Sequence, residues 1–121
     1  MSKYELGTSG HTFGRNQDHN LNKFESEFIQ GSIAITLDKF CIQKKFDIDY
    51  MKIDVDGNEL RVIEGMLEII KSKNIKKILV ELNLNLREHQ KVIEILRTND
   101  YQVIQKTKNK DNENLIFSIK N

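Results

Sequence analysis

The spacing of apolar and polar residues predicts an α/β fold after residue 32. Residues 58–72 place apolar side chains on a single stripe, at i, i+3, i+6, i+7 and i+10, as in an amphipathic helix. Residues 50–55 alternate with a period of two, as in a strand. Residues 75–82 contain three consecutive apolar residues, which is typical of a parallel strand covered on both faces. Two strands joined by such a helix predict a right-handed βαβ unit.

The other patterned segments complete the order of elements. A short strand or an extended lead-in is expected at 32–37, and Thr36 or Asp38 could cap a short helix directly after it. A further amphipathic helix is expected at 86–98, with His89 packed on its inner stripe. Strands are expected at 101–105 and 115–119, separated by a polar loop. Because the last two strands are close in sequence, we expect them to pair as an antiparallel hairpin.

The first 31 residues have no comparable period, although they hold four of the six glycines. The run Gly7–Gly14 could suggest a phosphate-binding loop, but such loops need a buried strand before them and a helix after them. A surface loop is the better interpretation. We therefore divide the chain into a glycine- and polar-rich segment, residues 1–31, and an ordered domain, residues 32–121.

Composition narrows the functional classes. Nineteen Lys and Arg residues nearly cancel eighteen Asp and Glu residues, so no net field favours nucleic acid or a membrane surface. No apolar run is long enough to span a membrane, and the first residues do not resemble a signal peptide. The single cysteine, Cys41, cannot form an internal disulfide and is expected to be a small buried hydrophobe. These features predict a cytoplasmic protein.

Candidate chemistry gathers where the 50–55 strand ends. Asp54 and Asp56 are followed by Gly57, and the periodic helix begins immediately afterwards. Open α/β sheets build ligand sites at the carboxyl ends of their strands. Asp54 could act as a general base if burial raises its pKa; alternatively, both acids only end the strand and cap the helix. Gly57 is expected to form a tight turn, with a positive φ.

Four neighbouring residues are candidates for substrate binding or for supporting the site. Lys52 is either an ion-pair partner of these acids or a solvent-facing side chain, and Glu59 is either a structural acid of the first helical turn or part of the site. Glu81 and Asn83 end the next strand. Together with Asp54, these two oxygen-bearing side chains would suit a divalent cation such as Mg²⁺.

The segment Lys52-Ile-Asp-Val-Asp-Gly-Asn-Glu59, continued to Gly65, closely resembles the signature of the FkbM-type methyltransferase family, Lys-Ile-Asp-Val-Glu-Gly-x-Glu-x-x-Val-Leu-x-Gly. The chain departs from this pattern only at Asp56, where the family has Glu, and at Ile63, where it has Leu. Other segments that resemble the family are residues 35–40, 78–82 and 99–103.

This resemblance implies a truncated class I methyltransferase sheet, Rossmann-like, with parallel strands, helices and a C-terminal antiparallel hairpin. Family members use S-adenosylmethionine to methylate hydroxyl groups of sugars or natural products. The resemblance places the tip of the 50–55 strand beside the transferred methyl group. It therefore implies Asp54 as the catalytic residue, bonded to the substrate hydroxyl or to the cofactor, and Asp54, Asp56 and Gly57 as cofactor-binding residues.

By this alignment, the chain begins after the family's third strand and lacks the glycine-rich turn and the ribose-binding acid. We expect a partial domain that needs a missing half or a partner chain; the alternative is a non-catalytic remnant that binds or dimerises. The outer edge of the 50–55 strand should be open, and we expect it to pair with a second copy or a partner chain, or to be covered by residues 1–35. A receiver-like domain phosphorylated at Asp54 would need an acidic pair on an earlier strand, which is absent.

Overall fold

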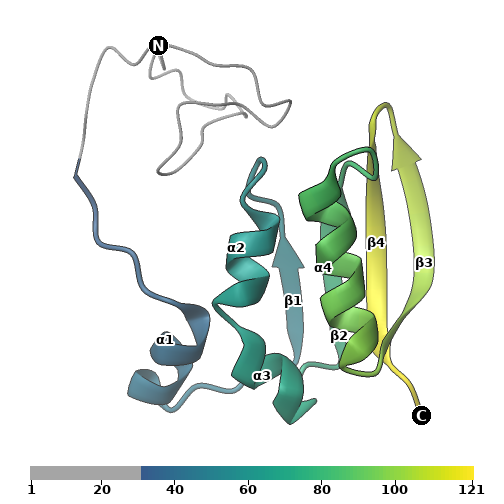
Figure 1. Cartoon of the computed structure of the whole chain (residues 1–121). Coiled ribbons are helices and arrows are strands. Elements are labelled where there is room, and N and C mark those ends of the chain that lie inside the picture. Colours follow the sequence, from purple (N-terminus) through teal and green to yellow (C-terminus); the bar gives the residue numbers. More distant parts are fainter. Residues whose placement is uncertain (1–30) are drawn as a thin grey trace. The chain divides into compact units, whose positions relative to one another are not determined.

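One mixed sheet with the strand order β1–β2–β4–β3 forms the centre of the fold in the computed structural model, which describes residues 31–121 (Figure 1). The strands are β1 (Tyr50–Ile53), β2 (Lys77–Leu82), β3 (Tyr101–Asn109) and β4 (Asn112–Ile119). β1 and β2 are parallel, with Tyr50 opposite Lys77. β4 is antiparallel to both β2 and β3. The predicted parallel pair and the predicted hairpin are therefore confirmed, and β1–β2 is the part of a Rossmann-like parallel sheet that these residues show.

The described residues fall into two units. One unit, residues 35–54 and 59–121, contains every helix and strand of the described part of the chain. The other unit includes the described residues 31–34 and 55–58, which have no helix or strand. The predicted N-terminal segment up to residue 30, with its phosphate-loop alternative at Gly7–Gly14, lies outside the described residues, and so does most of the 1–35 stretch considered as a cover for β1.

Two of the four helices lie against one face of the sheet. The helices are α1 (Leu37–Lys44), α2 (Glu59–Glu64), α3 (Leu67–Ser72) and α4 (Arg87–Thr98), and Figure 1 shows α2 and α4 in front of the sheet. Ile78, Val80 and Leu82 of β2 are fully buried, whereas Leu79, which points to the opposite face, is partly exposed. Burial of β2 on both faces, as predicted, is therefore wrong for this part of the chain, because its helices cover only one face.

The helix predicted over residues 58–72 is two helices, α2 and α3, and the prediction of one continuous helix is wrong. The break follows from contacts made by Asp38 of α1. The backbone carbonyl of Gly65 accepts a hydrogen bond from the Asp38 N–H at 3.0 Å. The Asp38 carboxylate accepts hydrogen bonds from the N–H groups of Glu68 and Ile69, each at 3.0 Å. A side chain distant in sequence thus caps α3 and starts a new helix where the periodic pattern continues.

Of the two interpretations of residues 32–37, the strand is wrong, because residues 31–36 have no regular structure and α1 begins at Leu37, whereas an extended lead-in agrees with the extended backbone of Thr36. The Thr36 hydroxyl accepts a hydrogen bond from the Lys39 N–H at 3.2 Å, which caps α1. This is one of the two capping residues that the sequence offered. A helix cap competes with extended pairing, and no strand of the described residues lies next to this segment.

The polar loop predicted between the last two strands is shorter than expected. β3 and β4 continue through it, and the chain turns at Lys110 and Asp111, where Lys110 has a φ of 53°. Lys106 and Glu113 form an ion pair across the two strands at 2.7 Å. Polar residues can extend a hairpin when opposite charges face each other across the strands.

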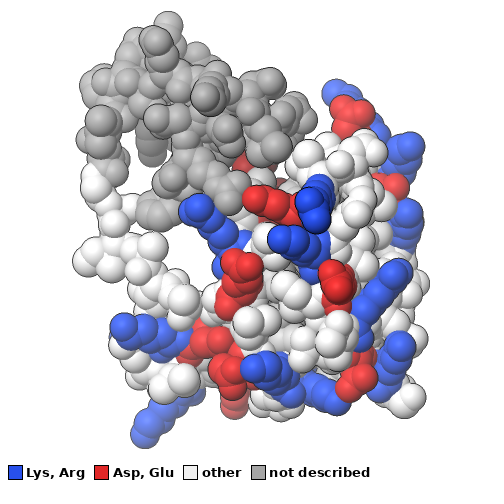
Figure 2. Space-filling model, in the orientation of Figure 1, with Lys and Arg blue, Asp and Glu red and all other residues white. Residues whose placement is uncertain are grey.

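The surface agrees with the balanced composition. Acidic and basic side chains are interspersed over the face that carries the helices (Figure 2). No helix in the described part of the chain has both the length and the apolar character needed to cross a membrane.

Candidate functional site

The candidate site starts at the carboxyl end of β1, where Asp54 follows the buried Ile53. The Asp54 side chain is 42% exposed, and its Oδ2 lies 3.2 Å from Nζ of Lys52. Residues two positions apart in an extended chain share a face of the sheet, which brings this pair together. The burial that the predicted general-base role required is therefore not present at Asp54, and the ion-pair interpretation of Lys52 is confirmed.

The turn after Asp54 uses two consecutive residues with positive φ. Asp56 has a φ of 47° and Gly57 a φ of 94°, which confirms the backbone conformation predicted for Gly57. Glycine adopts this region without a steric penalty, and aspartate is one of the few other residues that visit it. The turn reverses the chain within a few residues, so that α2 begins at Glu59.

Glu59 is buried and lies against a histidine of α4. Its residue surface is 3% exposed and that of His89 is 5% exposed. Glu59 Oε2 lies 3.0 Å from His89 Nε2. Burying a carboxylate is costly unless it is paired. Glu59 therefore has the structural role that was one of its two predicted interpretations.

The same histidine also contacts the end of β2. The backbone N–H of Asn83 donates a hydrogen bond to His89 Nδ1 at 2.8 Å. Because Nδ1 is an acceptor, a neutral imidazole carries its proton on Nε2, the nitrogen that lies 3.0 Å from Glu59 Oε2. His89 thus joins the residue after β2 to the first residue of α2. His89 is packed, as predicted. Its contacts with Glu59 and with the backbone of Asn83 were not predicted, because no local sequence pattern indicates them.

Glu81 and Asn83 are placed differently from each other. Glu81 is partly exposed and lies on the face of β2 away from α2 and α4; extending the β1–β2 register by one residue sets it opposite Asp54. The amide oxygen of Asn83 instead accepts a hydrogen bond from the Asn85 N–H at 3.0 Å. No group of three His, Cys, Asp or Glu side chains in residues 31–121 is arranged to hold a metal ion. The divalent cation therefore stays a prediction.

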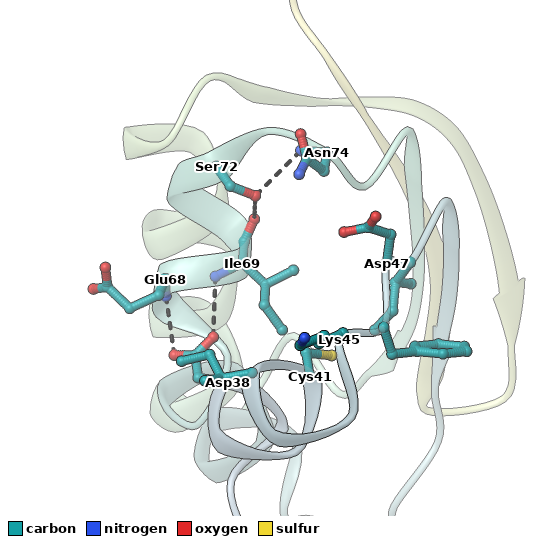
Figure 3. Close-up of a pocket in the computed structure, with 11 residues that line it drawn as sticks. Asp38, Cys41, Lys45, Asp47, Glu68, Ile69, Ser72 and Asn74 are labelled. Atoms are coloured by element: carbon teal, nitrogen blue, oxygen red, sulfur yellow. Dashed lines mark hydrogen bonds between the residues drawn. The ribbon is translucent and has the colours of Figure 1, made fainter.

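A separate pocket of about 390 Å³ lies between α1 and α3 and the segment that leads into β1 (Figure 3). Its walls include Cys41, Phe46, Asp47 and Ile69. Burial raises the pKa of the Cys41 thiol, and the negative charges of Asp38 and Asp47 raise it further. The thiol is therefore protonated at neutral pH and unsuited to nucleophilic attack. Sequence analysis predicted the burial of Cys41 but gave no sign of this pocket, which depends on the separate placement of α1.

Comparison with known proteins identifies the family. No curated protein and no solved structure gives a significant match to the chain. A family model described as the methyltransferase FkbM domain matches residues 3–103, a range that contains β1, its acidic tip, the Glu59–His89 pair and β2. The match covers well over half of the chain, and the chain therefore belongs to the methyltransferase FkbM domain family.

Proposed function

We propose that this chain forms the Asp54 side of an S-adenosylmethionine-dependent methyl-transfer site that acts on a hydroxyl group of a sugar or natural product. Membership of the FkbM family supports a methyltransferase function in general. The observation that carries the proposal is the position of Asp54, exposed at the carboxyl end of a strand that pairs in parallel with β2. Ligand sites of open α/β sheets lie at this end of the strands.

The residues at the tip fit the charged amino-acid end of the cofactor, which supplies a methyl group bound to a positively charged sulfur. The exposed Asp54 carboxylate can accept hydrogen bonds from an ammonium group. Alternatively, Asp54 accepts a hydrogen bond from the hydroxyl group of the substrate and takes the proton that this hydroxyl loses. Lys52, 3.2 Å from Asp54, orients the carboxylate in either arrangement.

The buried pair positions the two strand ends without contacting substrate. Glu59 fixes the start of α2 through His89, and His89 fixes the backbone of Asn83 after β2. Sites built on such supported elements hold their geometry better than sites on free loops. Asp56 and Gly57 shape the turn that joins Asp54 to α2. We propose that the remaining cofactor contacts come from residues outside 31–121, in this chain or in a partner.

The proposal is tested by calorimetric titration of the full chain with S-adenosylmethionine. We expect Asp54→Asn to weaken binding about tenfold, which corresponds to about 1.4 kcal/mol. Asp49→Asn is the matched control, because Asp49 is also an exposed acid, at the opposite end of β1, paired with Lys76 at 2.7 Å. It should leave the affinity unchanged. Equal effects of the two substitutions would contradict the role of Asp54.

A second function, a binding or dimerisation module without catalysis, is the alternative. The edge of β1 that no strand of residues 31–121 covers favours it, since exposed strand edges pair with other chains. The same titration separates the two functions. No binding heat at millimolar S-adenosylmethionine would reject the methyl-transfer site and favour the module.

A further inference from the structure

The exposed apolar side chains of the unit that contains the sheet are concentrated in residues 35–50, the segment that leads into β1 and includes its first residue. Five large apolar residues between positions 35 and 50 are at least 40% exposed, against one elsewhere in the described part of this unit, Ile104. Tyr50 of β1 is 67% exposed, Ile42 is 75% exposed and Phe46 is 56% exposed. The rings of Phe40 and Phe46 lie edge to face with their centroids 6.4 Å apart. Such clusters mark interaction surfaces more often than isolated apolar residues do.

In the part of the chain that the structure describes, the outer edge of β1 has no partner strand. Among residues 31–121, β1 pairs only with β2. The carbonyl of Asp49 accepts a hydrogen bond from the Lys76 N–H at 2.7 Å, so Asp49 directs its backbone groups toward β2. Successive residues of a strand direct these groups to opposite edges. Tyr50 and Lys52 therefore present their N–H and C=O groups to the open edge.

We propose that a second copy of this chain pairs with this edge, β1 against β1 in antiparallel orientation about a two-fold axis at Met51. In this register, Tyr50 lies opposite Lys52 of the second copy, and both residues direct their backbone groups outward. They can therefore exchange N–H···O=C bonds, and the symmetry repeats the exchange on the other side of the axis. The two four-stranded sheets become one sheet of eight strands. This inference does not depend on the methyl-transfer site.

Charge selects this register. It places the ammonium group of Lys52 beside the aromatic ring of Tyr50 across the interface, a favourable cation–π arrangement. A shift of the second copy by two residues would place Lys52 opposite Lys52, and like charges opposite each other disfavour strand pairing. The short strand β1 is thus complementary to a copy of itself in one register.

The apolar area beside β1 is large enough for a weak dimer. Five exposed side chains that each bury on the order of 100 Å² give about 1,000 Å² for two copies, the lower end of specific interfaces. In Figure 1, α1 lies on the side of β1 away from β2, so its apolar residues flank the edge that the second copy would use. Edge pairing alone would leave these residues in water.

Sedimentation of the full chain tests the proposal. As the concentration of the wild-type chain is raised to about 100 micromolar, we expect dimers to form. Tyr50→Lys should weaken the dimer at least about tenfold, because the new cation lies opposite Lys52 of the second copy. Ile104→Lys is the matched control: it adds the same charge to an exposed apolar position on β3, the other edge strand, and should leave the dimer unchanged. Circular dichroism confirms that both variants fold.

A cross-link reports the register. Met51→Cys places two thiols at the two-fold axis, in a non-hydrogen-bonded pair whose Cβ atoms approach within disulfide range. Oxidation should give a covalent dimer with Met51→Cys and none with Ile104→Cys or with the wild-type chain, whose Cys41 is buried. A wild-type monomer over this range, equal dimerisation of Tyr50→Lys and wild type, or failure of Met51→Cys to cross-link would each overturn the proposal.

Discussion

Two polar pairs flank the turn between β1 and α2, and they differ in environment rather than in distance. Lys52 and Asp54 are 3.2 Å apart, and their side chains are 64% and 42% exposed. Glu59 and His89 are 3.0 Å apart, but their side chains are only 4% and 6% exposed. Water screens the first pair, and the protein interior surrounds the second.

Because of this difference, residues only a few positions apart have different roles: one pair is accessible to a ligand and the other stabilises the fold. An exposed ion pair adds little stability and leaves the Asp54 carboxylate accessible to a ligand. A buried pair cannot be broken cheaply, because the remaining partner keeps the cost of its burial. Glu59 therefore holds α2 in place, and Asp54 is available for binding. Substitutions on the two sides should have opposite profiles, with stability lost at one pair and ligand affinity lost at the other.

The largest effect is expected from Glu59→Ala. It leaves the Nε2–H of His89 buried without its carboxylate, and we expect the free energy of unfolding to fall by about 3 kcal/mol. Urea unfolding measures this loss. Glu64→Ala, an exposed acid on the same helix, is the control and should change the free energy of unfolding by less than about 0.5 kcal/mol. A loss at Glu59 no larger than that at Glu64 would show that the buried pair is not structural.

Glu59→Gln sharpens this result, because the amide keeps a polar group beside His89 while the charge is removed. We expect a loss of about 1 kcal/mol, between the control and the alanine variant. Equal losses for Gln and Ala would mean that the charge of Glu59, rather than its polar contact with His89, stabilises the fold.

A smaller effect is expected from Asp38→Ala, which removes the two hydrogen bonds that cap the N-terminus of α3. The N–H groups of Glu68 and Ile69 would lose their carboxylate acceptor, and a missing N-cap costs about 1–2 kcal/mol. Asp38 is an intermediate case, since it is charged but bonds to backbone groups. Thermal unfolding of Asp38→Ala and Asp38→Asn measures the loss, and the asparagine variant should retain much of the cap. No change in either variant would contradict the account of the helix break.

The sequence predicted those parts of the fold that follow from local periodicity. The strands at 50–55 and 75–82, the helix at 86–98 and the final hairpin are all present, because each has its apolar stripe or alternation within one segment. The break at Gly65 was missed because its cause, Asp38, lies on another helix. A periodic pattern carries no information about a cap supplied from a distant segment.

The candidate site divides in the same way. The Lys52–Asp54 pair and the positive φ of Gly57 were predictable, since residues two apart on a strand share a face and a strand-to-helix turn favours glycine. The partner of Glu59 was not predictable, because His89 reaches it only through the packing of α4 on α2. The bond from the Asn85 N–H to the Asn83 side chain is different, because it is a local turn between residues two apart, which asparagine favours.

Lys52→Ala should have a much smaller effect on stability than Glu59→Ala. The pair it breaks is exposed, so we expect the free energy of unfolding to change by less than about 0.5 kcal/mol. The affinity for S-adenosylmethionine should nevertheless fall, because Lys52 orients Asp54. Unfolding in urea and calorimetric titration of the same protein measure the two quantities. A large loss of stability with unchanged affinity would reverse the roles assigned to the two pairs.

The smallest effect is expected at a third pair, Lys73 and Asp100, which is also exposed and whose contribution to the free energy of unfolding should depend on pH. The hydrogen bond from Lys73 lowers the pKa of Asp100 below its ordinary value of 3.8, and the positive charge of Lys73 adds to this shift. A lowered carboxyl pKa contributes stability above the unfolded value, and this contribution is lost as the pH falls through the folded value. Asp100→Asn removes the titrating group and keeps a residue that tolerates the φ of 66° at this position. In urea unfolding at a series of pH values, the wild-type chain should therefore be slightly more stable than Asp100→Asn at neutral pH, and the difference should disappear below about pH 4. A difference that stayed constant from neutral to acidic pH would show that the pair acts by packing rather than by charge.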